Sequence, residues 1–262
     1  MALMRPAAVA GHFYPARPEE LTAMLAGWLD MPHPPAPPAP KAIVAPHAGY
    51  IYSGALAADC HRRFLPDRDI IRRVVLMGPA HRVPLRGLAT TSADIWATPL
   101  GPIAIDREAL AELTDLPFLA VNDAAHAQEH ALEVHLPILK LALPQAKLVP
   151  FVVGQASHEQ VAAVLNRLWD GSQTRIVISS DLSHYHTYAE AKALDARTAS
   201  AVEALDETAL GRDQACGRIP LGGLIQAARQ RGLAVQRVGL INSGDTAGDK
   251  NKVVGYGGWS FG

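Results

Sequence analysis

The amino-acid sequence predicts one α/β domain over residues 1–262, with a mixed, mainly parallel sheet flanked by helices. Short apolar segments typical of buried strands alternate with segments of helical periodicity, which is the pattern of a sheet covered on both faces. With 262 residues, 49% of them hydrophobic, the chain can bury a sizeable core. Three strand-like segments end in Pro, Gly or Ser and lead to a histidine: 42–45 to His47, 74–77 to His81, and 176–178 to His184.

The N-terminal part predicts an extended segment followed by a helix. Residues 5–17 are interrupted by Pro and Gly, and Pro18 then begins a segment with two acidic residues in its first turn. Apolar residues from Leu21 to Leu29 recur at helical spacing, so we expect one face of this helix to be buried. The proline-rich residues 32–40 predict a polyproline-II connector on the surface of the domain.

The rest of the chain alternates between predicted strands and helices. An irregular stretch at 82–101 ends in a tight turn at 96–101, and Asp106 stands at the cap position of the helix that follows. The expected helices lie at 55–64, 106–113, from about 136 to 143, 158–169, 188–205 and 220–231, and the expected strands at 73–77, 148–154, 175–179 and 235–241.

Composition excludes several classes of function. The formal net charge of −1, without a block of like charges, gives no electrostatic basis for binding nucleic acid or an anionic membrane. Two cysteines, Cys60 and Cys216, are too few for a disulfide scaffold, so a reducing cytoplasm is expected. The N-terminus lacks the apolar region of a signal peptide, and no apolar run approaches the ~20 residues of a membrane span.

His47 and His81 are the first candidates for chemistry. Each follows a proline within two residues at the end of a strand, where open α/β sheets hold their ligands. Two neutral imidazoles that project into one crevice are suited to sharing a metal ion or a proton. The alternative is that each is a loop histidine bonded to the backbone.

Asp181 and His184 form a second candidate pair. A carboxylate three residues before an imidazole can fix its tautomer or accept its N–H, as a general base requires. Alternatively, Asp181 caps the helix expected from Thr187. His186 is the less favoured histidine, because an i+2 ring shares a face with His184 only where the backbone does not turn.

The segment from His126 to His130 spells H-x-x-E-H, the inverted motif of some zinc proteases, with Glu129 between the two histidines. A zinc hydrolase built on His126, Glu129 and His130 is therefore an alternative. Further along, His130, Glu133 and His135 cannot all face one site if the helix is ideal.

Cys216 directly precedes a predicted helix, a position that lowers the pKa of a thiol and favours the thiolate. The alternative, a small buried apolar residue, is the interpretation we favour for Cys60.

Several ordered motifs resemble the Memo family: APHAGYIYSG, GPAH, EHALEVHLP, SSDLSHYH and ACGRIP, with AGHFYP near the start and VVGYGGW near the end. The resemblance covers nearly the whole chain. It implies a fold like that of class III extradiol dioxygenases of the LigB type, a mixed α/β sandwich around a metal crevice.

The resemblance also implies roles for individual residues. His47, His81 and Cys216 match the metal-binding triad, where the dioxygenases have two histidines and a carboxylate. His184 matches the acid/base histidine, with Asp181 beside it, and His130, Glu133 and His135 match further substrate-pocket positions. The family is implicated in copper binding and redox chemistry, and its prokaryotic members are often encoded near a radical-SAM protein, as the name AmmeMemoRadiSam indicates.

A thiolate is a softer ligand than a carboxylate, so it shifts the metal preference of the site toward copper(I), zinc or thiolate-tolerant iron(II). Extradiol ring cleavage is therefore not expected here. We therefore expect a metal-dependent oxidoreductase with one copper or iron ion, zinc being the other option, that can be lost on purification. His184 would act as acid/base oriented by Asp181, and Tyr52 would line the entrance for an unknown small molecule or peptide. A non-catalytic adaptor that uses the same pocket is the main alternative, and a homo-oligomer is the base-rate expectation.

Overall fold

The computed structural model describes residues 2–31, 39–169, 171–211 and 213–262, which form a mixed α/β domain around one large sheet. Within these residues the sheet has nine strands in the order β10-β12-β2-β9-β3-β8-β4-β7, with β11 paired to β12. Its centre is parallel: β2 (Ala42–Ala45), β9 (Thr174–Ser179), β3 (Arg73–Pro79) and β8 (Lys147–Val153). These strands are almost entirely buried, as their continuous apolar sequences predict.

The flanks of the sheet are antiparallel or mixed. On one side β12 (Val253–Phe261) pairs antiparallel with β2, with β11 (Val235–Asn242) and with the short β10 (His184–His186). On the other side β4 (Leu88–Thr90) is antiparallel to β8 and parallel to β7 (Leu119–Val121). The mixed sheet expected from the sequence is therefore confirmed, with its parallel part confined to the centre and to the pairing of β4 with β7.

Strand β12 is the main element that the sequence did not predict. Its glycines lower strand propensity, but they are needed for packing. A Cβ added to Gly257 would lie 2.1 Å from the Trp259 ring, and one added to Gly258 would lie 2.5 Å from Cys60 Sγ. The glycines thus let β12 approach the helix that carries Cys60.

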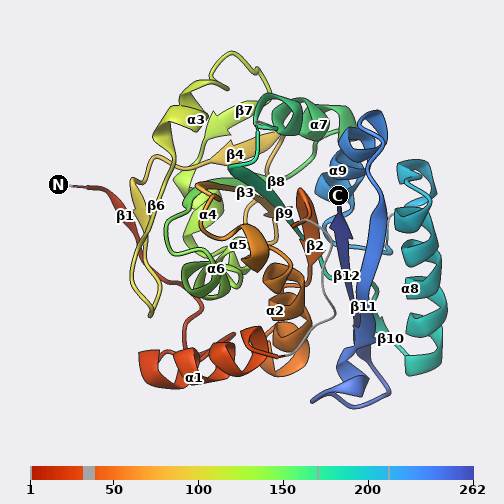
Figure 1. The fold of residues 1–262 in the computed structure, drawn as a ribbon. Coiled ribbons are helices and arrows are strands. Elements are labelled where there is room, and N and C mark those ends of the chain that lie inside the picture. The colour runs from red at the N-terminus through yellow and green to blue at the C-terminus, as the bar shows by residue number, and fades with distance from the viewer. Residues whose placement is uncertain (1, 32–38, 170, 212) are drawn as a thin grey trace.

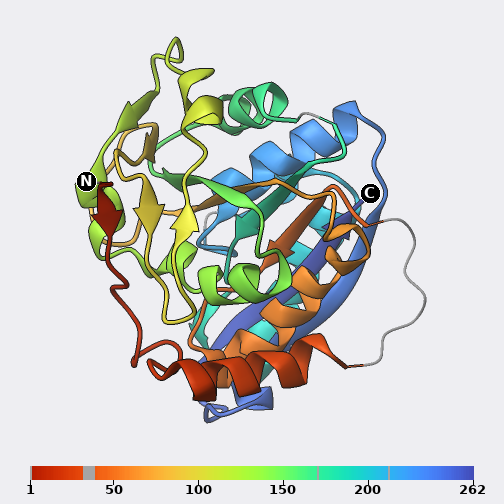
Figure 2. The ribbon, with the colours of Figure 1, turned by 60° about the vertical axis from the view of Figure 1, so that its left-hand side comes forward.

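Helices cover both faces of the sheet (Figures 1 and 2). One layer contains α1, α2, α5 and α6, which contact one another or the adjacent strands, and the other contains α7, α8 and α9. Asp106 caps α3 and Ser157 caps α7, each accepting from a backbone N–H of the first turn. The bounds are α1 Pro18–Leu29, α2 Ala55–Arg62, α3 Arg107–Ala111, α4 Asp123–Ala127, α5 His130–Glu133, α6 Leu136–Ala142, α7 His158–Arg167, α8 Tyr188–Glu203 and α9 Arg218–Gln230.

A second, three-stranded sheet lies beside the N-terminus and consists of β1 (Met4–Arg5), β5 (Ile95–Trp96) and β6 (Ile103–Ala104). The stretch 82–101, expected to be irregular, thus contains β4 and β5. Its tight turn is confirmed, since the Gly101 N–H donates to the Thr98 carbonyl at 3.0 Å. The polyproline prediction falls largely on 32–38, outside the described residues.

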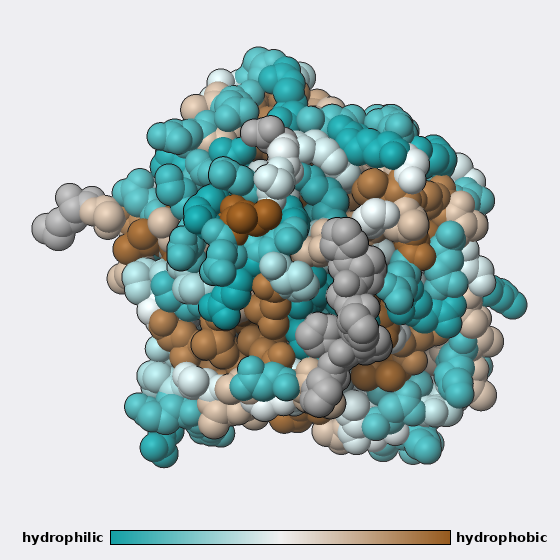
Figure 3. Space-filling model, viewed as in Figure 1, coloured by the Kyte–Doolittle hydropathy of each residue, from teal (hydrophilic) through white to brown (hydrophobic). Residues whose placement is uncertain are grey.

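The surface of the face in Figure 3 is mainly hydrophilic, and its hydrophobic residues lie in several separate areas, as is usual for a folded domain. Among the helices of the described residues, none combines the length and the apolar character needed to cross a bilayer.

Candidate functional site

The candidate site lies at the carboxyl ends of β2, β3 and β9, which meet at one edge of the sheet. His47 follows β2, His81 follows β3, and Asp181 follows β9. The His47 and His81 rings meet edge to face, with centroids 5.2 Å apart. The expectation that strand-end motifs bring both histidines into one crevice is therefore confirmed.

The hydrogen bonds of His47 fix its tautomer. Ser179 Oγ donates its proton to the Ala131 carbonyl at 2.6 Å, so it can only accept from His47 Nδ1, which lies 2.6 Å away. His47 Nε2 is then unprotonated, and it lies 3.4 Å from Cys216 Sγ. Burial, followed by the neighbouring imidazoles, lowers the pKa of His47 well below its ordinary value, so its neutral form is favoured.

Cys216 reaches the site from the loop before α9. Its backbone N–H donates to the Asp181 carbonyl at 3.2 Å, and its Sγ accepts from the Asp181 N–H at 3.3 Å. A Cβ on Gly217 would lie 2.6 Å from the Ser179 carbonyl oxygen, so only glycine lets the start of α9 come this close to β9.

The expected effect of the α9 N-terminus on Cys216 is outweighed by burial. Burial, with a smaller contribution from the negative charge of Asp181, raises the pKa of the Cys216 thiol. A bound cation acts in the opposite direction, because a coordinating thiol is deprotonated by the metal.

His81 is oriented by Glu129, a buried carboxylate at the N-terminus of α5. The His81 backbone N–H donates to Glu129 Oε2 at 2.6 Å, and His81 Nδ1 lies 2.9 Å from Oε1, which leaves Nε2 as the free nitrogen. His130 Nδ1 lies 3.2 Å from the same Oε1, and its ring stacks on His81. Burial opposes ionisation of Glu129, but the contacts with His130 and His81 lower its pKa below the usual range.

The sequence assigned Glu129 only to the hydrolase alternative, and the structure gives it this orienting role instead. The sequence signal that could have identified this role is the position of Glu129 directly before His130 in a histidine-rich segment.

The donor set fits a metal ion. One ligand atom each of His47, His81 and Cys216 lies within 4.8 Å of the others. Bonds of about 2.0–2.3 Å place the ligands of a tetrahedral ion roughly 3.4–3.6 Å apart, so a small contraction completes the site. A second group, His81, Glu129 and His130, shares His81. Its carboxylate already accepts from His81 and from the Ala131 N–H, which makes the first group the better site.

His184 lies beside this centre with its own tautomer fixed. Its Nδ1 is 2.8 Å from the Leu182 carbonyl, which can only accept, so in the neutral ring the proton is on Nδ1 and Nε2 carries the lone pair. The sequence-based expectation that Asp181 orients this ring is wrong: Asp181 Oδ1 instead accepts the His47 backbone N–H at 2.8 Å. Burial raises the pKa of Asp181, partly offset by that bond and by nearby imidazoles.

His186 is separated from His184 by an irregular backbone. Tyr185 has a φ of 64°, and the pairing of β10 with β12 shifts register between the two histidines. Such a conformation is rare for a bulky residue and is typical of functional segments. His184 therefore lines a cavity at the site, whereas His186 is not among the described lining residues.

Glu133 lies away from the site, contrary to the substrate-pocket role that the resemblance implied. It is fully buried and pairs with Arg5 at 2.7 Å, while its oxygens also accept from the Ala8 and Val9 N–H groups and from the Tyr14 hydroxyl. Glu133 therefore anchors the N-terminal segment.

His135 is also fully buried, and its ring packs 5.1 Å from that of His61. Neither Glu133 nor His135 lines the cavities of the site, whereas His130 does. Of the three positions beyond the triad that the resemblance implied, only His130 faces the crevice.

The His126 side chain also lies apart from those of Glu129 and His130, so the three residues of the zinc-hydrolase alternative do not form one metal site. Helix α4 ends at Ala127, so the i, i+4 spacing does not place both histidines on one helical face. His126 Nε2 instead lies 3.1 Å from the Ala89 carbonyl, and its ring packs against Trp96.

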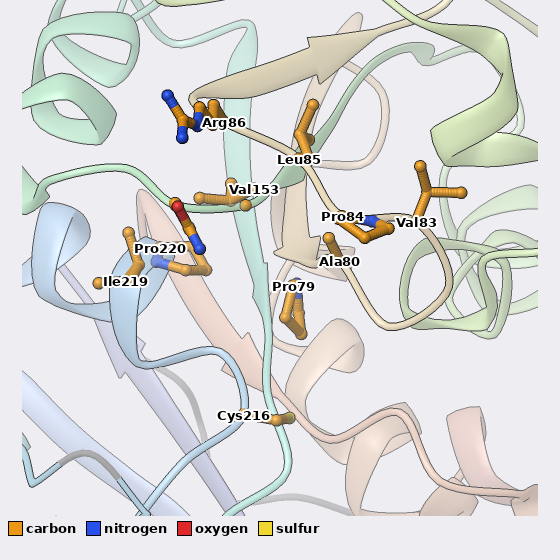
Figure 4. Close-up of a pocket in the computed structure, with 12 residues that line it drawn as sticks. Pro79, Ala80, Val83, Pro84, Leu85, Arg86, Val153, Cys216, Ile219 and Pro220 are labelled. Carbon is orange, nitrogen blue, oxygen red and sulfur yellow. The ribbon is translucent and has the colours of Figure 1, made fainter.

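Two cavities open at the centre. The histidine cavity has a volume of about 320 Å³ and is lined by Asp181, His130, His184 and aromatic residues that include Phe13, Tyr52, Tyr185 and Tyr256. The Arg86 cavity, of about 570 Å³, lies between the loop after β3 and the start of α9, with Cys216 at one end (Figure 4). Of the metal group, Cys216 lines the Arg86 cavity. The histidine cavity reaches the group through Asp181, which holds the His47 backbone.

Comparison with known proteins gives one family. The model of Memo-like proteins matches residues 5–260. The chain is 36% identical over 275 residues to a MEMO1 family protein of Aquifex aeolicus, covering 98% of this chain and 99% of that one. It is 32% identical over 251 residues to the human protein MEMO1, covering 85% and 84%.

Among solved structures, an uncharacterized protein of Escherichia coli K12 aligns with 82% of this chain and 98% of its own, at 12% identity and a TM-score of 0.49. The extent of the sequence matches, together with the motifs now found around one crevice, shows that this chain belongs to the Memo family.

Proposed function

We propose that this protein is a metal-dependent oxidoreductase in which His47, His81 and Cys216 hold one copper or iron ion. The observation that carries the proposal is the convergence of these three side chains from three separate segments, with Nδ1 of both imidazoles held by protein groups so that Nε2 is left for a metal. Ser179 and Glu129 support the two imidazoles as the outer partners of metal ligands do.

The thiolate of Cys216 favours copper(I), thiolate-tolerant iron(II) or zinc over magnesium or calcium. Copper or iron bound here would supply one-electron redox chemistry. Zinc fits the same donors without redox activity, so the identity of the metal decides whether the site is an oxidoreductase.

His184 is the proposed acid/base residue. Its Nε2 carries the lone pair, and the residue lines the histidine cavity, so it can accept a proton from a substrate there and return it. Tyr52 and the other aromatic residues of this cavity provide apolar surface around the substrate. Asp181 contributes by holding the backbone of His47 and the loop of Cys216.

A second candidate function is a non-catalytic binding protein that takes a small molecule or peptide in the histidine cavity. Tyr185 favours it, because this residue is 72% exposed at a strained backbone position on the cavity wall. Exposed aromatic residues of this kind are typical of binding surfaces.

The test is metal analysis of untagged protein purified without oxygen, for wild type, Cys216→Ala and Cys60→Ala. Cys60 is the matched control, since its thiol is fully buried away from both metal groups. We expect near-stoichiometric copper or iron in wild type and Cys60→Ala, and its loss in Cys216→Ala. Equal, negligible metal in all three proteins would refute the oxidoreductase and leave the binding protein as the better candidate.

A further inference from the structure

The Arg86 cavity has a wall chemistry unlike that of the histidine cavity. It is lined mainly by Pro, Ala, Val, Leu and Ile side chains, and Arg86 is the one charged side chain among the described residues that line it. The histidine cavity instead contains a carboxylate and several imidazoles. The two cavities are therefore suited to different parts of a substrate or to different substrates.

Arg86 has a guanidinium without a protein partner. Within the described residues it takes part in no hydrogen bond or ion pair through its side chain, although its side chain is always charged. Asp181, the acidic residue that contacts Cys216, lines the histidine cavity and is not among the described residues that line the Arg86 cavity. The positive charge of Arg86 is thus available to a ligand.

The backbone of Arg86 is held in place. The Gly87 N–H donates to the Gln155 carbonyl at 2.9 Å, and the Gln155 N–H donates to the Leu85 carbonyl at 2.7 Å. Gly87 has a φ of +76°, and a Cβ on Gly154 would lie 2.1 Å from the Leu85 carbonyl oxygen, so both glycines are needed for this close approach. The backbone that carries the exposed Arg86 side chain is therefore held in a fixed position.

Cys216 and Arg86 lie at opposite ends of the lining residues, with Pro79, Ala80, Val153 and Pro220 between them (Figure 4). Helix α9 begins beside the same cavity, and the positive end of its dipole adds to the attraction for an anion. A ligand that fills this space has an apolar body, one end at Cys216 and an acidic group at Arg86.

We propose that the Arg86 cavity binds an elongated organic anion, an apolar chain with a terminal carboxylate or phosphate, and presents its other end to the metal centre. The assignment of this anion as the substrate rests on the proposed function, whereas its binding rests on the cavity alone. Arg86 is the residue that selects the acidic group, since guanidinium pairs with two oxygens of a carboxylate or phosphate.

The test uses Cys216 in metal-free protein as a reporter. Two maleimides of matched length, 6-maleimidohexanoic acid and neutral N-hexylmaleimide, add to the thiolate by forming one C–S bond while the neighbouring carbon takes a proton from water. The protein carries Cys60→Ala, so that one thiol remains. The variants are Arg86→Gln and, as a control of equal charge change in the same loop, Arg82→Gln.

We expect the acidic reagent to react faster than the neutral one, and Arg86→Gln to reduce this ratio roughly tenfold, the usual effect of losing a bond to a charged group. Arg82→Gln should leave the ratio unchanged. A ratio that is the same with and without Arg86 would overturn the proposal, as would an equal loss in both variants.

Competition then identifies the acidic group. Hexanoate or hexyl phosphate should slow labelling in the presence of Arg86, and hexanol should not. Protection by only one of the two acids identifies that acid, and protection by neither overturns the proposal. Metal analysis separates this result from the proposed function: absence of metal in the wild type refutes the function, while a labelling ratio that Arg86→Gln leaves unchanged, in a protein that purifies with full metal content, refutes only the cavity assignment.

Discussion

Replacement of Glu133 by glutamine tests whether this residue anchors the N-terminal segment. The carboxylate is fully buried, pairs with Arg5 at 2.7 Å and accepts from Val9 at 2.8 Å and from the Tyr14 hydroxyl at 2.7 Å. The amide keeps one acceptor oxygen but places an NH₂ group against N–H donors and leaves the Arg5 charge without its partner.

Breaking a buried ion pair from one side costs about 3–5 kcal/mol, and because one acceptor remains we expect a loss of about 3 kcal/mol in the free energy of unfolding. Urea unfolding of both proteins measures this value. Asp115→Asn is the control, because Asp115 pairs with Arg167 on the surface, and we expect no measurable change there.

The same substitution has a second readout near the site. The anchored segment carries Phe13, whose ring lies 4.7 Å from that of His130, so loosening the segment should expose residues 2–17 to limited proteolysis. A Glu133→Gln protein within 1 kcal/mol of wild type, with an equally resistant N-terminus, would show that Glu133 is not a structural anchor.

Two further predictions concern the histidines. Ser179→Ala removes the acceptor of His47 Nδ1, and we expect metal affinity, measured by competition with a chelator, to fall roughly 10–100-fold with Cys216 intact; unchanged affinity would contradict the tautomer assignment. Burial lowers the pKa of His61 to about 4, below its value in the unfolded chain, so its contribution to stability is full above pH 6.5 and is lost as pH falls from 6.5 to 4. The unfolding free energies of wild type and His61→Gln should therefore converge over this range by about 3 kcal/mol, and parallel curves would argue against a neutral buried His61.

Local sequence was sufficient for the central architecture. The continuous apolar segments of β2, β3 and β9 predict strands buried on both faces, and Pro or Gly after them predicts the loops that carry His47 and His81. Helix caps such as Asp106 are also local, because the capping atoms lie within three residues of each other. Parallel strands then bring their carboxyl ends to one edge of the sheet, which places both histidines at that edge.

Strand β12 and Cys216 required the tertiary structure. The value of the glycines in β12 depends on the Trp259 and Cys60 atoms they make room for, and these contacts are not visible in the strand itself. The helix position of Cys216 predicts a lowered pKa, but burial and Asp181, a residue 35 positions away, reverse the direction.

The roles of the acidic residues were likewise decided by partners far along the chain. Glu133 and Glu129 are four residues apart, yet one binds Arg5, 128 residues away, and the other orients His81, 48 residues away. Asp181 accepts the backbone N–H of His47, whereas His184 Nδ1 bonds to the Leu182 carbonyl. The sequence by itself therefore determined which residues reach the edge of the sheet, since strand burial and turn chemistry are local. Only the tertiary structure decided which of them meet, because hydrogen-bond partners and burial are set by segments that fold together across the whole domain.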